Sequence, residues 1–372
     1  MKPFAFAHAA TVADAVAAAA AGARYYAGGT NLLDLMKTGV ELPDSLIDIG
    51  RLDLRSITQT ASGGVLIESG VSNSALANHP LIRRRYPVLS QAILSGATTQ
   101  LRNMATVGGN LLQRTRCPYF MDTAFEYCNK RLPGSGCAAR DGFHREHAVF
   151  GADRSCIAVH PSDMAVALAI LDAVVHVVGP HGQRTIAIAE FFALPGAHPE
   201  RDNTLGAAEL ITGVELPAPA FGAGSWYLKV RDRHSYAFAL VSVAAGLDID
   251  DGVIRSAAVA LGGVAAKPWR VAAAECSLIG QPAVIETYRR AAGLMMAGAE
   301  PLSENGFKVE LGRKSVIRAL TIAASRHDQS ARHRLGDGLA AEDAVLQGDQ
   351  QGVAGLLGGD ELIEPEVTRR PE

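Results

Sequence analysis

The first part of the chain alternates between helix-like and strand-like spacing of its apolar positions. Thr11, a residue type that caps helices, precedes an alanine-rich stretch, so a helix is predicted to begin there. A glycine-rich turn at Gly28-Gly29-Thr30 then separates a short apolar strand from a second helix. The pattern predicts strands at 23–27, 45–49 and 64–70, and helices from Asn31 and at 88–94. The strand 64–70 and the helix 88–94 belong to a second predicted subdomain.

The periodic pattern disappears between residues 115 and 154, where Gly, Pro, Arg and Cys dominate. An irregular loop of this length inside a compact domain is usually functional. Regular spacing returns at Ser162, which we expect to cap a helix. Two strands, 174–178 and 183–188, then form a predicted hairpin around Gly179-Pro180-His181-Gly182.

A proline-containing segment, Leu216-Pro217-Ala218-Pro219, is typical of a linker and precedes the last regular part of the chain. Strands are predicted there at 226–230, 239–249 and 253–261, followed by helical patterning over 270–324. An Asp250-Asp251-Gly252 turn joins the last two strands. Beyond Ser325 the sequence is polar and rich in glycine, and we expect a tail that is disordered or draped over a partner.

Composition limits the class of protein. With 372 residues, 48% of them hydrophobic, the chain can bury a large core in two or three domains. A net charge of −3 with mixed signs offers no basic face for nucleic acid. The start lacks the apolar region of a secretory signal, and the apolar runs 17–21 and 164–178 are too short to span a membrane. We therefore expect a soluble protein with no nucleic-acid partner and no membrane span.

Two short segments combine glycines with polar residues. Residues 27–34, Ala-Gly-Gly-Thr-Asn-Leu-Leu-Asp, place two glycines between a predicted strand and helix, where backbone N–H groups can approach an anion. Residues 105–110, Ala-Thr-Val-Gly-Gly-Asn, offer the same chemistry. Together they can grip both sides of a pyrophosphate, although each alone is also compatible with an ordinary tight turn. Neither matches G-x-G-x-x-G, so Rossmann-type NAD binding is not supported.

These segments resemble motifs of the FAD-binding subunits and domains of the xanthine dehydrogenase/aldehyde oxidase/carbon monoxide dehydrogenase family, the molybdenum hydroxylases. That family carries A-G-G-T-D/N-L and A-T-x-G-G-N at this separation. Its continuation, S-P-x-S-D-x-x-P-A-L-L-A-L, is matched by residues 160–168, and residues 229–233 and 261–268 resemble its C-terminal flavoprotein domain. The resemblance extends from Met1 to about Ala324.

The resemblance implies an α+β fold. A two-subdomain FAD-binding domain of the PCMH/vanillyl-alcohol-oxidase type would be followed by a small three-stranded α+β domain like the carbon monoxide dehydrogenase flavoprotein C-terminal domain. It places the FAD-binding domain at 1–217 with an insertion at 111–160, the C-terminal domain at 222–324, and the tail at 325–372.

It also implies a set of FAD-binding residues. Asp163 would contact the ribose or ribitol, Ile211 would border the adenine, and Lys229 would lie near the flavin ring. Outside the resemblance, Asp163 is compatible with a carboxylate in the first turn of a helix, and Lys229 with a solvated strand residue. The pyrophosphate would be held by Ala27, Gly28, Gly29, Thr30, Asn31, Leu32, Leu33 and Asp34, with Thr106, Gly109 and Asn110 opposite.

Four of the five cysteines fall within the insertion, in the pattern Cys-x10-Cys-x8-Cys-x18-Cys. They are Cys117, Cys128, Cys137 and Cys156, and four thiolates are the standard ligand set of a [4Fe-4S] cluster. No C-x-x-C knuckle is present, which disfavours a zinc ribbon, and paired disulfides are the other alternative. Cys276 stands apart in an apolar helical stretch, where we expect a buried core thiol.

Neighbouring residues suit a cluster of negative charge. We expect the basic residues of the insertion to offset that charge, and Gly134 and Gly136 to free N–H groups for hydrogen bonds to sulfur. The basic residues are Arg114, Arg116, Lys130 and Arg131.

The insertion resembles the one in the FAD subunit of bacterial periplasmic aldehyde oxidoreductases, a subgroup with an additional [4Fe-4S] cluster in this subunit. The flavin subunit of 4-hydroxybenzoyl-CoA reductase carries one on a different insertion. The resemblance therefore implies a cluster held by the four clustered cysteines, with zinc or disulfides as the remaining alternatives.

The resemblance implies an electron relay with no catalytic residue in this chain. In the family, substrate is oxidised at a molybdenum cofactor in a large partner chain, and electrons pass through [2Fe-2S] clusters in a small partner to FAD. A heterotrimer is expected, with oxygen or a ferredoxin-like protein as acceptor, since no NAD motif is visible. Export to the periplasm would depend on a partner's signal; the cytoplasm is the alternative. Other hypotheses are the flavin subunit of an aromatic acyl-CoA reductase or purine hydroxylase, and a non-enzymatic zinc-binding interaction module.

Overall fold

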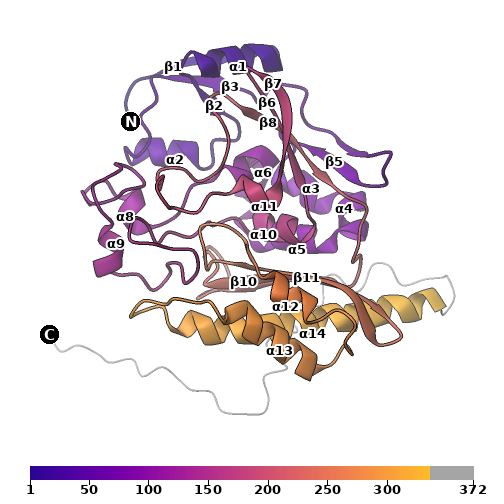
Figure 1. The fold of residues 1–372 in the computed structure, drawn as a ribbon. Coiled ribbons are helices and arrows are strands. Elements are labelled where there is room, and N and C mark those ends of the chain that lie inside the picture. The colour runs from indigo at the N-terminus through magenta and orange to yellow at the C-terminus, as the bar shows by residue number, and fades with distance from the viewer. Residues whose placement is uncertain (336–372) are drawn as a thin grey trace. The chain divides into compact units, whose positions relative to one another are not determined.

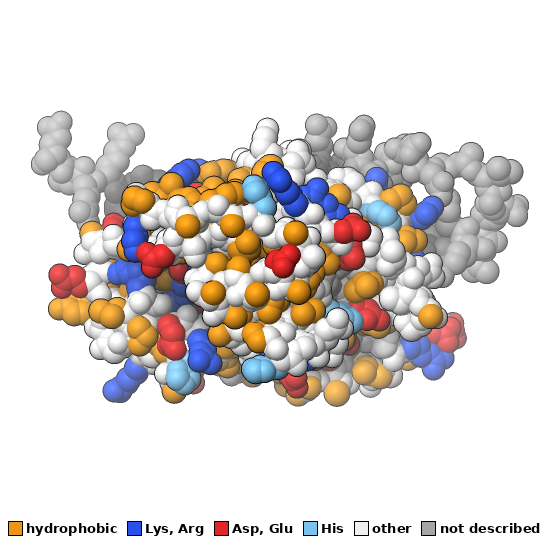
Figure 2. Space-filling view, turned by 90° about the horizontal axis from the view of Figure 1, so that it is seen from above, with side chains coloured by type: hydrophobic (Ala, Val, Ile, Leu, Met, Phe, Trp, Pro, Cys, Tyr) orange, Lys and Arg blue, Asp and Glu red, His pale blue; other side chains and the backbone are white. Residues whose placement is uncertain are grey.

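The computed structural model describes residues 1–335, and residues 1–330 form one compact unit (Figure 1). Its N-terminal part is a parallel three-stranded sheet against which α1 packs. As predicted, the Thr11 hydroxyl accepts the Asp14 N–H at 3.1 Å, and the Asp14 carboxylate accepts the Thr11 N–H at 3.0 Å. On the face seen from above in Figure 1, acidic and basic side chains lie scattered among hydrophobic ones (Figure 2). The elements are β1 (Ala5–His8), α1 (Val12–Ala20), β2 (Arg24–Tyr26), α2 (Leu32–Lys37) and β3 (Ser45–Asp48), in the sheet order β1-β3-β2.

A second, antiparallel sheet forms the middle of the unit, with helices packed on it. The predicted cap of α10 is confirmed, because the Ser162 hydroxyl accepts the Ala165 N–H at 3.0 Å. The predicted hairpin is confirmed as β6 and β7. The strands lie in the order β4 (Ile57–Gln59), β5 (Val65–Glu68), β8 (Leu210–Leu216), β6 (Val174–Gly179) and β7 (Gly182–Ala187). The helices are α3 (Asn73–Asn78), α4 (Pro80–Arg85), α5 (Pro87–Ser95), α6 (Thr99–Met104), α7 (Val107–Leu111), α10 (Asp163–Ile170) and α11 (Ile188–Phe191).

A third sheet is buried on both faces. Alternate residues of β10 point to opposite sides: Ala244 joins the core around α10, while Val243 and Ala245 join the core around α14. This explains why β10 is a continuous apolar run rather than an alternating one. The elements are β9 (Ser225–Val230), β10 (Val241–Asp250), β11 (Val253–Gly262), β12 (Trp269–Arg270), α12 (Ala272–Cys276), α13 (Ile285–Met296) and α14 (Phe307–Leu335).

Two expectations for this part are wrong. The sheet has four strands, because the two-residue strand β12 pairs with β11 and is too short to leave a periodic signal. The helix α14 continues to Leu335, so residues 325–335 are not a disordered tail. Val316, Leu320 and Ala323 of this helix are buried in the core beside the sheet. Because that packing stabilises the helix, its polar C-terminal turns can continue it without apolar contacts of their own. The remaining tail, 336–372, lies outside the described residues.

The apolar run 164–178 does not form one helix. It divides into α10 and the strand β6, which are separated at Asp172, a residue with φ of 49°. Within residues 1–335, no helix combines the length and the apolar character that crossing a membrane requires.

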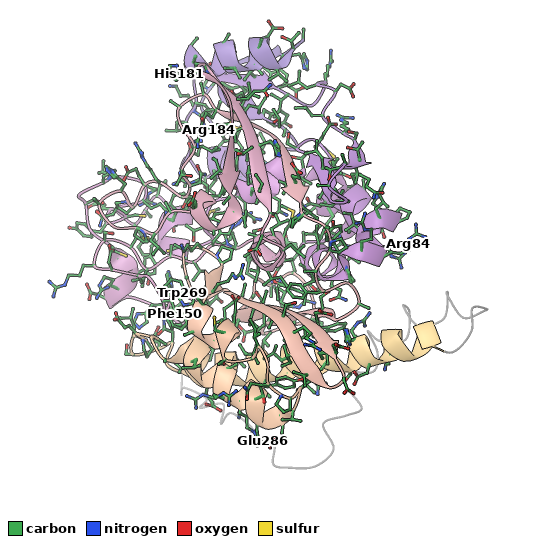
Figure 3. All side chains as sticks on the ribbon, turned by 45° about the vertical axis from the view of Figure 1, so that its right-hand side comes forward. Arg84, Phe150, His181, Arg184, Trp269 and Glu286 are labelled. Atoms are coloured by element: carbon green, nitrogen blue, oxygen red, sulfur yellow. The ribbon has the colours of Figure 1, made fainter. Side chains whose placement is uncertain are left out.

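The insertion 111–160 is irregular, as predicted, apart from the short helices α8 (Pro118–Met121) and α9 (Ala138–Asp141). Arg131 holds its first half together by donating to the carbonyls of Tyr119 and Phe120 at 3.0 and 3.1 Å. Its last residues join the third sheet, where Phe150 stacks on Trp269 with ring centroids 5.0 Å apart (Figure 3). Side-chain and backbone polar bonds therefore replace the missing periodic core.

Candidate functional site

The first glycine turn presents a row of unbonded backbone N–H groups. It joins β2 to α2, and the N–H groups from Gly28 to Leu32 donate to no group in residues 1–335. Gly29 adopts a φ of 71°, in the left-handed region that glycine favours. Successive free N–H groups around a left-handed residue form a cradle for an anion. The turn can therefore hold a phosphate, in the place predicted from the sequence.

The second glycine turn packs directly behind the first. A Cβ added to Gly28 would lie 1.9 Å from the Met104 carbonyl oxygen, so only glycine permits this approach. The two turns do not offer the same chemistry, which corrects the sequence-based expectation. The N–H of Gly108 donates to Ser69 O at 2.9 Å, and that of Gly109 donates to the Thr106 hydroxyl at 3.2 Å, as part of the cap of α7. The second turn thus supports the first and offers side chains rather than free N–H groups.

Asparagine side chains connect the turns to neighbouring segments. The Asn31 carbonyl oxygen accepts the Arg114 N–H at 2.9 Å, while its buried amide nitrogen Nδ2 has no partner among the described residues. The Asn110 carbonyl oxygen accepts the Ser162 hydroxyl at 2.5 Å. An unpartnered buried donor beside the free N–H groups fits a site that binds an anionic ligand. Ile211, which is 2% exposed, lies behind Gly108 in the core.

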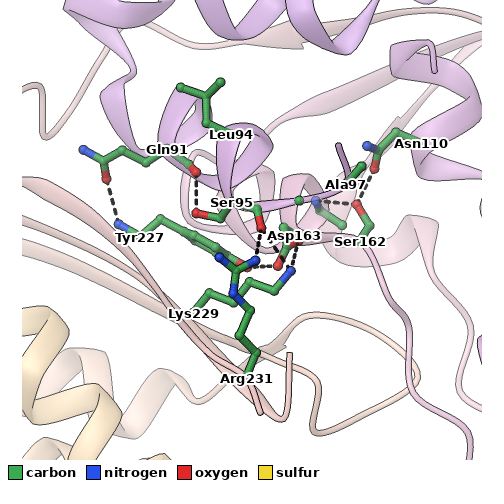
Figure 4. A network of polar contacts seen from close by, with 12 residues as sticks. Gln91, Leu94, Ser95, Ala97, Asn110, Ser162, Asp163, Tyr227, Lys229 and Arg231 are labelled. Atoms are coloured by element: carbon green, nitrogen blue, oxygen red, sulfur yellow. Dashed lines mark hydrogen bonds and ion pairs between the residues drawn. The ribbon is translucent and has the colours of Figure 1, made fainter. Parts of the chain in front are cut away.

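Asp163 and Lys229 lie together in a buried network (Figure 4). The Lys229 ammonium is 2.8 Å from Asp163 Oδ2 and also donates to Ser95 O at 3.2 Å; the two side chains of the ion pair are 5% and 9% exposed. Tyr227 donates its hydroxyl to Asp163 Oδ1 at 2.6 Å. Burial and the neighbouring Asp163 hold the pKa of Tyr227 well above its usual value. Lys229 is therefore not a solvated strand residue.

Tyr227 was missed in the sequence. It precedes Lys229 by two positions on β9, so both side chains project from the same face of the strand. That spacing was available as a signal, but only the structure shows that the Asp163 side chain of α10 reaches both residues.

A cavity lies beside Asp163. It is lined by residues 115–118, 146–147, 159–163 and 262–263, together with Phe238. Because 115–118 follow Arg114, which is bonded to Asn31, the cavity is connected along the chain to the first glycine turn. An extended ligand with an anionic middle and an aromatic end suits this arrangement.

The four clustered cysteines line one smaller pocket, and Cys117 lines the larger cavity as well. All four are free thiols. The Ala158 N–H donates to the Cys156 sulfur at 3.5 Å. Burial raises the pKa of Cys117 and of Cys137, and nearby backbone N–H groups partly oppose that rise. Within residues 1–335, no group of three or more His, Cys, Asp or Glu residues is arranged to hold a single metal ion.

The basic residues of the insertion are mostly engaged elsewhere, which corrects the expectation that all four offset a cluster. Arg114 pairs with Asp202 at 2.7 Å and Glu41 at 2.8 Å, and Arg131 is bonded to carbonyls. Lys130 pairs with Asp202 at 2.6 Å, yet its charge still acts to lower the pKa of Cys156, which burial raises to about 11. Of the four predicted cations, Lys130 is therefore the one whose charge lowers the pKa of a clustered cysteine, Cys156.

Two further expectations for this region are wrong. The Gly136 N–H donates to Asn129 Oδ1 at 2.8 Å and is not free for sulfur, because Gly136 serves the turn that faces Asn129. Cys276 is exposed at the end of α12 rather than buried, because the apolar face of that short helix is carried by Ala274.

His160 makes the stability of the protein depend on pH. It is buried, its Nε2 has no partner among the described residues, and burial lowers its pKa from 6.5 to about 4. Below pH 6.5 the unfolded chain therefore takes up a proton that the folded chain refuses down to about pH 4. The stabilising contribution is complete above pH 6.5 and is lost as the pH falls.

When the pH falls from 7 to 4.5, we expect the free energy of unfolding of the wild type to decrease by roughly 2–3 kcal/mol more than that of His160→Gln. Each unit of pKa difference between the unfolded and the folded chain corresponds to about 1.4 kcal/mol. Urea unfolding of both proteins at the two pH values measures this difference. Equal losses in the two proteins would contradict it.

Comparisons with known sequences agree with the geometry. The family described as the FAD binding domain in molybdopterin dehydrogenase matches residues 2–219, and the CO dehydrogenase flavoprotein C-terminal domain matches residues 226–326. The chain is 51% identical to the aldehyde oxidoreductase FAD-binding subunit PaoB of Escherichia coli K12, covering 88% of this chain and 100% of that protein. It is 26% identical to the glyceraldehyde dehydrogenase medium chain of Sulfolobus acidocaldarius, covering 81% and 89% of the two chains.

Solved structures share the fold. Carbon monoxide dehydrogenase from Hydrogenophaga pseudoflava matches with a TM-score of 0.68 and 26% identity, covering 88% of this chain and 99% of that one. Quinoline 2-oxidoreductase from Pseudomonas putida 86 matches with a TM-score of 0.68 and 23% identity, covering 87% and 98%, and supports the fold alone.

Proposed function

This chain belongs to the family of FAD-binding subunits of molybdenum hydroxylases, an oxidoreductase family, and we propose that it is the FAD subunit of an aldehyde oxidoreductase. The observation that carries the proposal is the similarity to PaoB over the whole length of that protein. The chain would relay electrons from [2Fe-2S] clusters of a partner chain to an external acceptor, either oxygen or a ferredoxin-like protein.

The residues of the first turn fit the diphosphate of FAD. The free N–H groups from Gly28 to Leu32 and the unpartnered Asn31 amide are donors for an anion. Bound there, FAD supplies the ability to take up and release electrons singly or in pairs. The cavity beside Asp163 would hold its ring, and Asp163 is fixed in the cavity wall by Lys229 and Tyr227. We place the FAD-binding domain at 1–217 and the C-terminal domain at 222–324, which the two matched regions support.

We also propose that Cys117, Cys128, Cys137 and Cys156 hold a [4Fe-4S] cluster. Their support is the shared pocket and the free thiols. Backbone N–H groups near sulfur stabilise thiolate ligands of iron, and the Ala158 N–H, which donates to Cys156, is one such donor in place of the Gly136 N–H. Burial raises the pKa of Cys117 to about 12, so assembly of the cluster must displace protons from the thiols.

The proposed complex is a heterotrimer with a large molybdenum-cofactor chain and a small [2Fe-2S] chain. Aldehyde oxidation would occur in the large chain, while this chain binds and orients the flavin. We propose the periplasm as its location, reached on a partner's signal, with the cytoplasm as the alternative.

Assembly tests the relay. The isolated, FAD-loaded chain should not oxidise aromatic aldehydes, and adding the two partner chains should give aldehyde-dependent reduction of an acceptor. The rate is measured with aromatic aldehydes, purines and aromatic acyl-CoA compounds. Aldehyde oxidation by the isolated chain would exclude the relay, and preference for a purine or acyl-CoA compound would assign the chain to another molybdenum hydroxylase.

A further inference from the structure

Arg116 places a cation in the wall of the larger cavity. Its guanidinium lies over the ring of Phe238, with the central carbon 5.3 Å from the ring centroid, and both residues line the cavity. The carboxylate that pairs with it, Asp34, is 4.0 Å away, and the Asp34 side chain is 54% exposed. The Arg116 Nε is buried and has no partner among the described residues. Its hydrogen-bonding capacity is therefore largely unused.

Neighbouring cations, unlike Arg116, have carboxylates within hydrogen-bond distance. Arg114 forms close ion pairs with Asp202 and Glu41, and Lys229 pairs with Asp163 at 2.8 Å. The Arg116 side chain is 25% exposed, and a largely buried cation without close pairing is unfavourable unless a ligand supplies the missing charge. The imbalance points to an occupant that is negative for at least part of the time.

Besides the proposed cluster on the adjacent Cys117, two parts of FAD could supply that charge: the diphosphate and the reduced ring. The diphosphate already has the run of free N–H groups from Gly28 to Leu32. Arg116 instead lines the cavity that Phe238 and Asp163 also line, which is the proposed place of the flavin ring. Uptake of two electrons, supplied by the [2Fe-2S] clusters of the proposed partner, together with one proton from solvent would give the bound ring one negative charge.

We propose that Arg116 stabilises the negative charge of the reduced flavin ring, and so sets how readily this subunit accepts electrons. The proposal rests on the proposed function, that the chain binds FAD. While the ring is oxidised and neutral, the nearest negative charge to Arg116 would be that of Asp34, 4.0 Å away. The interaction of Arg116 with the ring is therefore differential, and a differential interaction is what moves a redox equilibrium.

The test uses the purified full-length chain loaded with FAD. Wild type, Arg116→Gln and Arg116→Lys are reduced stepwise without oxygen, beside a two-electron dye of known potential. At equal dye ratio we expect the ratio of reduced to oxidised flavin to fall about tenfold in Arg116→Gln, which corresponds to about 30 mV for a two-electron couple. Arg116→Lys, which restores the charge, should recover most of the change.

Arg184→Gln is the matched control, because Arg184 lies on the β6–β7 hairpin and pairs with Glu209 at 2.6 Å (Figure 3). It should leave the flavin ratio unchanged. The affinity for oxidised FAD and the iron content are measured for every variant. An unchanged ratio in Arg116→Gln at full FAD occupancy, or no recovery in Arg116→Lys, would overturn the proposal. Loss of oxidised FAD from Arg116→Gln would assign the guanidinium to the diphosphate instead, whereas a wild type without FAD would refute the proposed function itself.

Discussion

Replacing Gly29 with valine should strip FAD from the chain. The residue has a φ of 71°, and a Cβ there would lie 2.8 Å from the Tyr26 ring and 3.1 Å from Leu33. A β-branched side chain cannot adopt this conformation without moving the turn, and the free N–H groups move with it. Hydrogen bonds to charged groups contribute about 1.5–3 kcal/mol each, so losing two weakens FAD binding roughly a hundredfold or more. The flavin released by denaturation, identified as FAD and counted per chain, measures the effect.

Gly39→Val is the matched control for this experiment. Gly39 follows α2 with a φ of 77°, and a Cβ there would have no neighbour within 4 Å. It suffers the same backbone strain away from the proposed diphosphate site. We expect Gly39→Val to lose some stability and keep its flavin. A Gly29→Val protein with full FAD would remove the diphosphate from this turn.

Local signals explain which parts of the fold were predictable. The caps at Thr11 and Ser162 are confirmed because each depends on bonds to a residue three positions away. The β10–β11 turn is confirmed for the same reason: Asp251 and Gly252 both adopt positive φ, which a two-residue turn between twisted strands requires. These features are contained within a few residues.

Features that depend on distant partners were not predictable. In the second glycine turn, the N–H groups of Val107 and Gly108 donate to the backbone carbonyls of Val71 and Ser69. No local sequence pattern connects these acceptors to the turn. Arg114 and Lys130 were expected beside a cluster, but both reach Asp202, more than seventy positions away. Family resemblance supplied the site residues, whereas the pairing of Asp163 with Lys229 and Tyr227 came from the packing of α10 on β10 and β11, beside β9.

Cys128→Ser should abolish the proposed cluster and leave FAD largely in place. Cys128 is 8% exposed and lies in the cysteine pocket, packed near Leu35 and Phe120. Serine keeps the size of the side chain but is a poor ligand for iron. The wild type, prepared without oxygen, should contain about four irons and four acid-labile sulfides per chain, and the variant should contain almost none. FAD should remain because the free N–H groups belong to the first glycine turn, outside the insertion.

Cys276→Ser separates a ligand from an ordinary thiol. Cys276 is exposed at the end of α12, outside the cysteine pocket, so its replacement should leave iron and sulfide unchanged. In the Cys128→Ser protein, the first half of the insertion should also keep much of its shape. The hydrogen bonds from Arg131 to the Tyr119 and Phe120 carbonyls, which hold it together, do not involve sulfur. Loss of iron with an intact segment would mark the cysteines as cluster ligands rather than structural cross-links. The absence of acid-labile sulfide from the wild type would exclude the cluster. Bound zinc in place of iron would exclude it as well and would favour a zinc site.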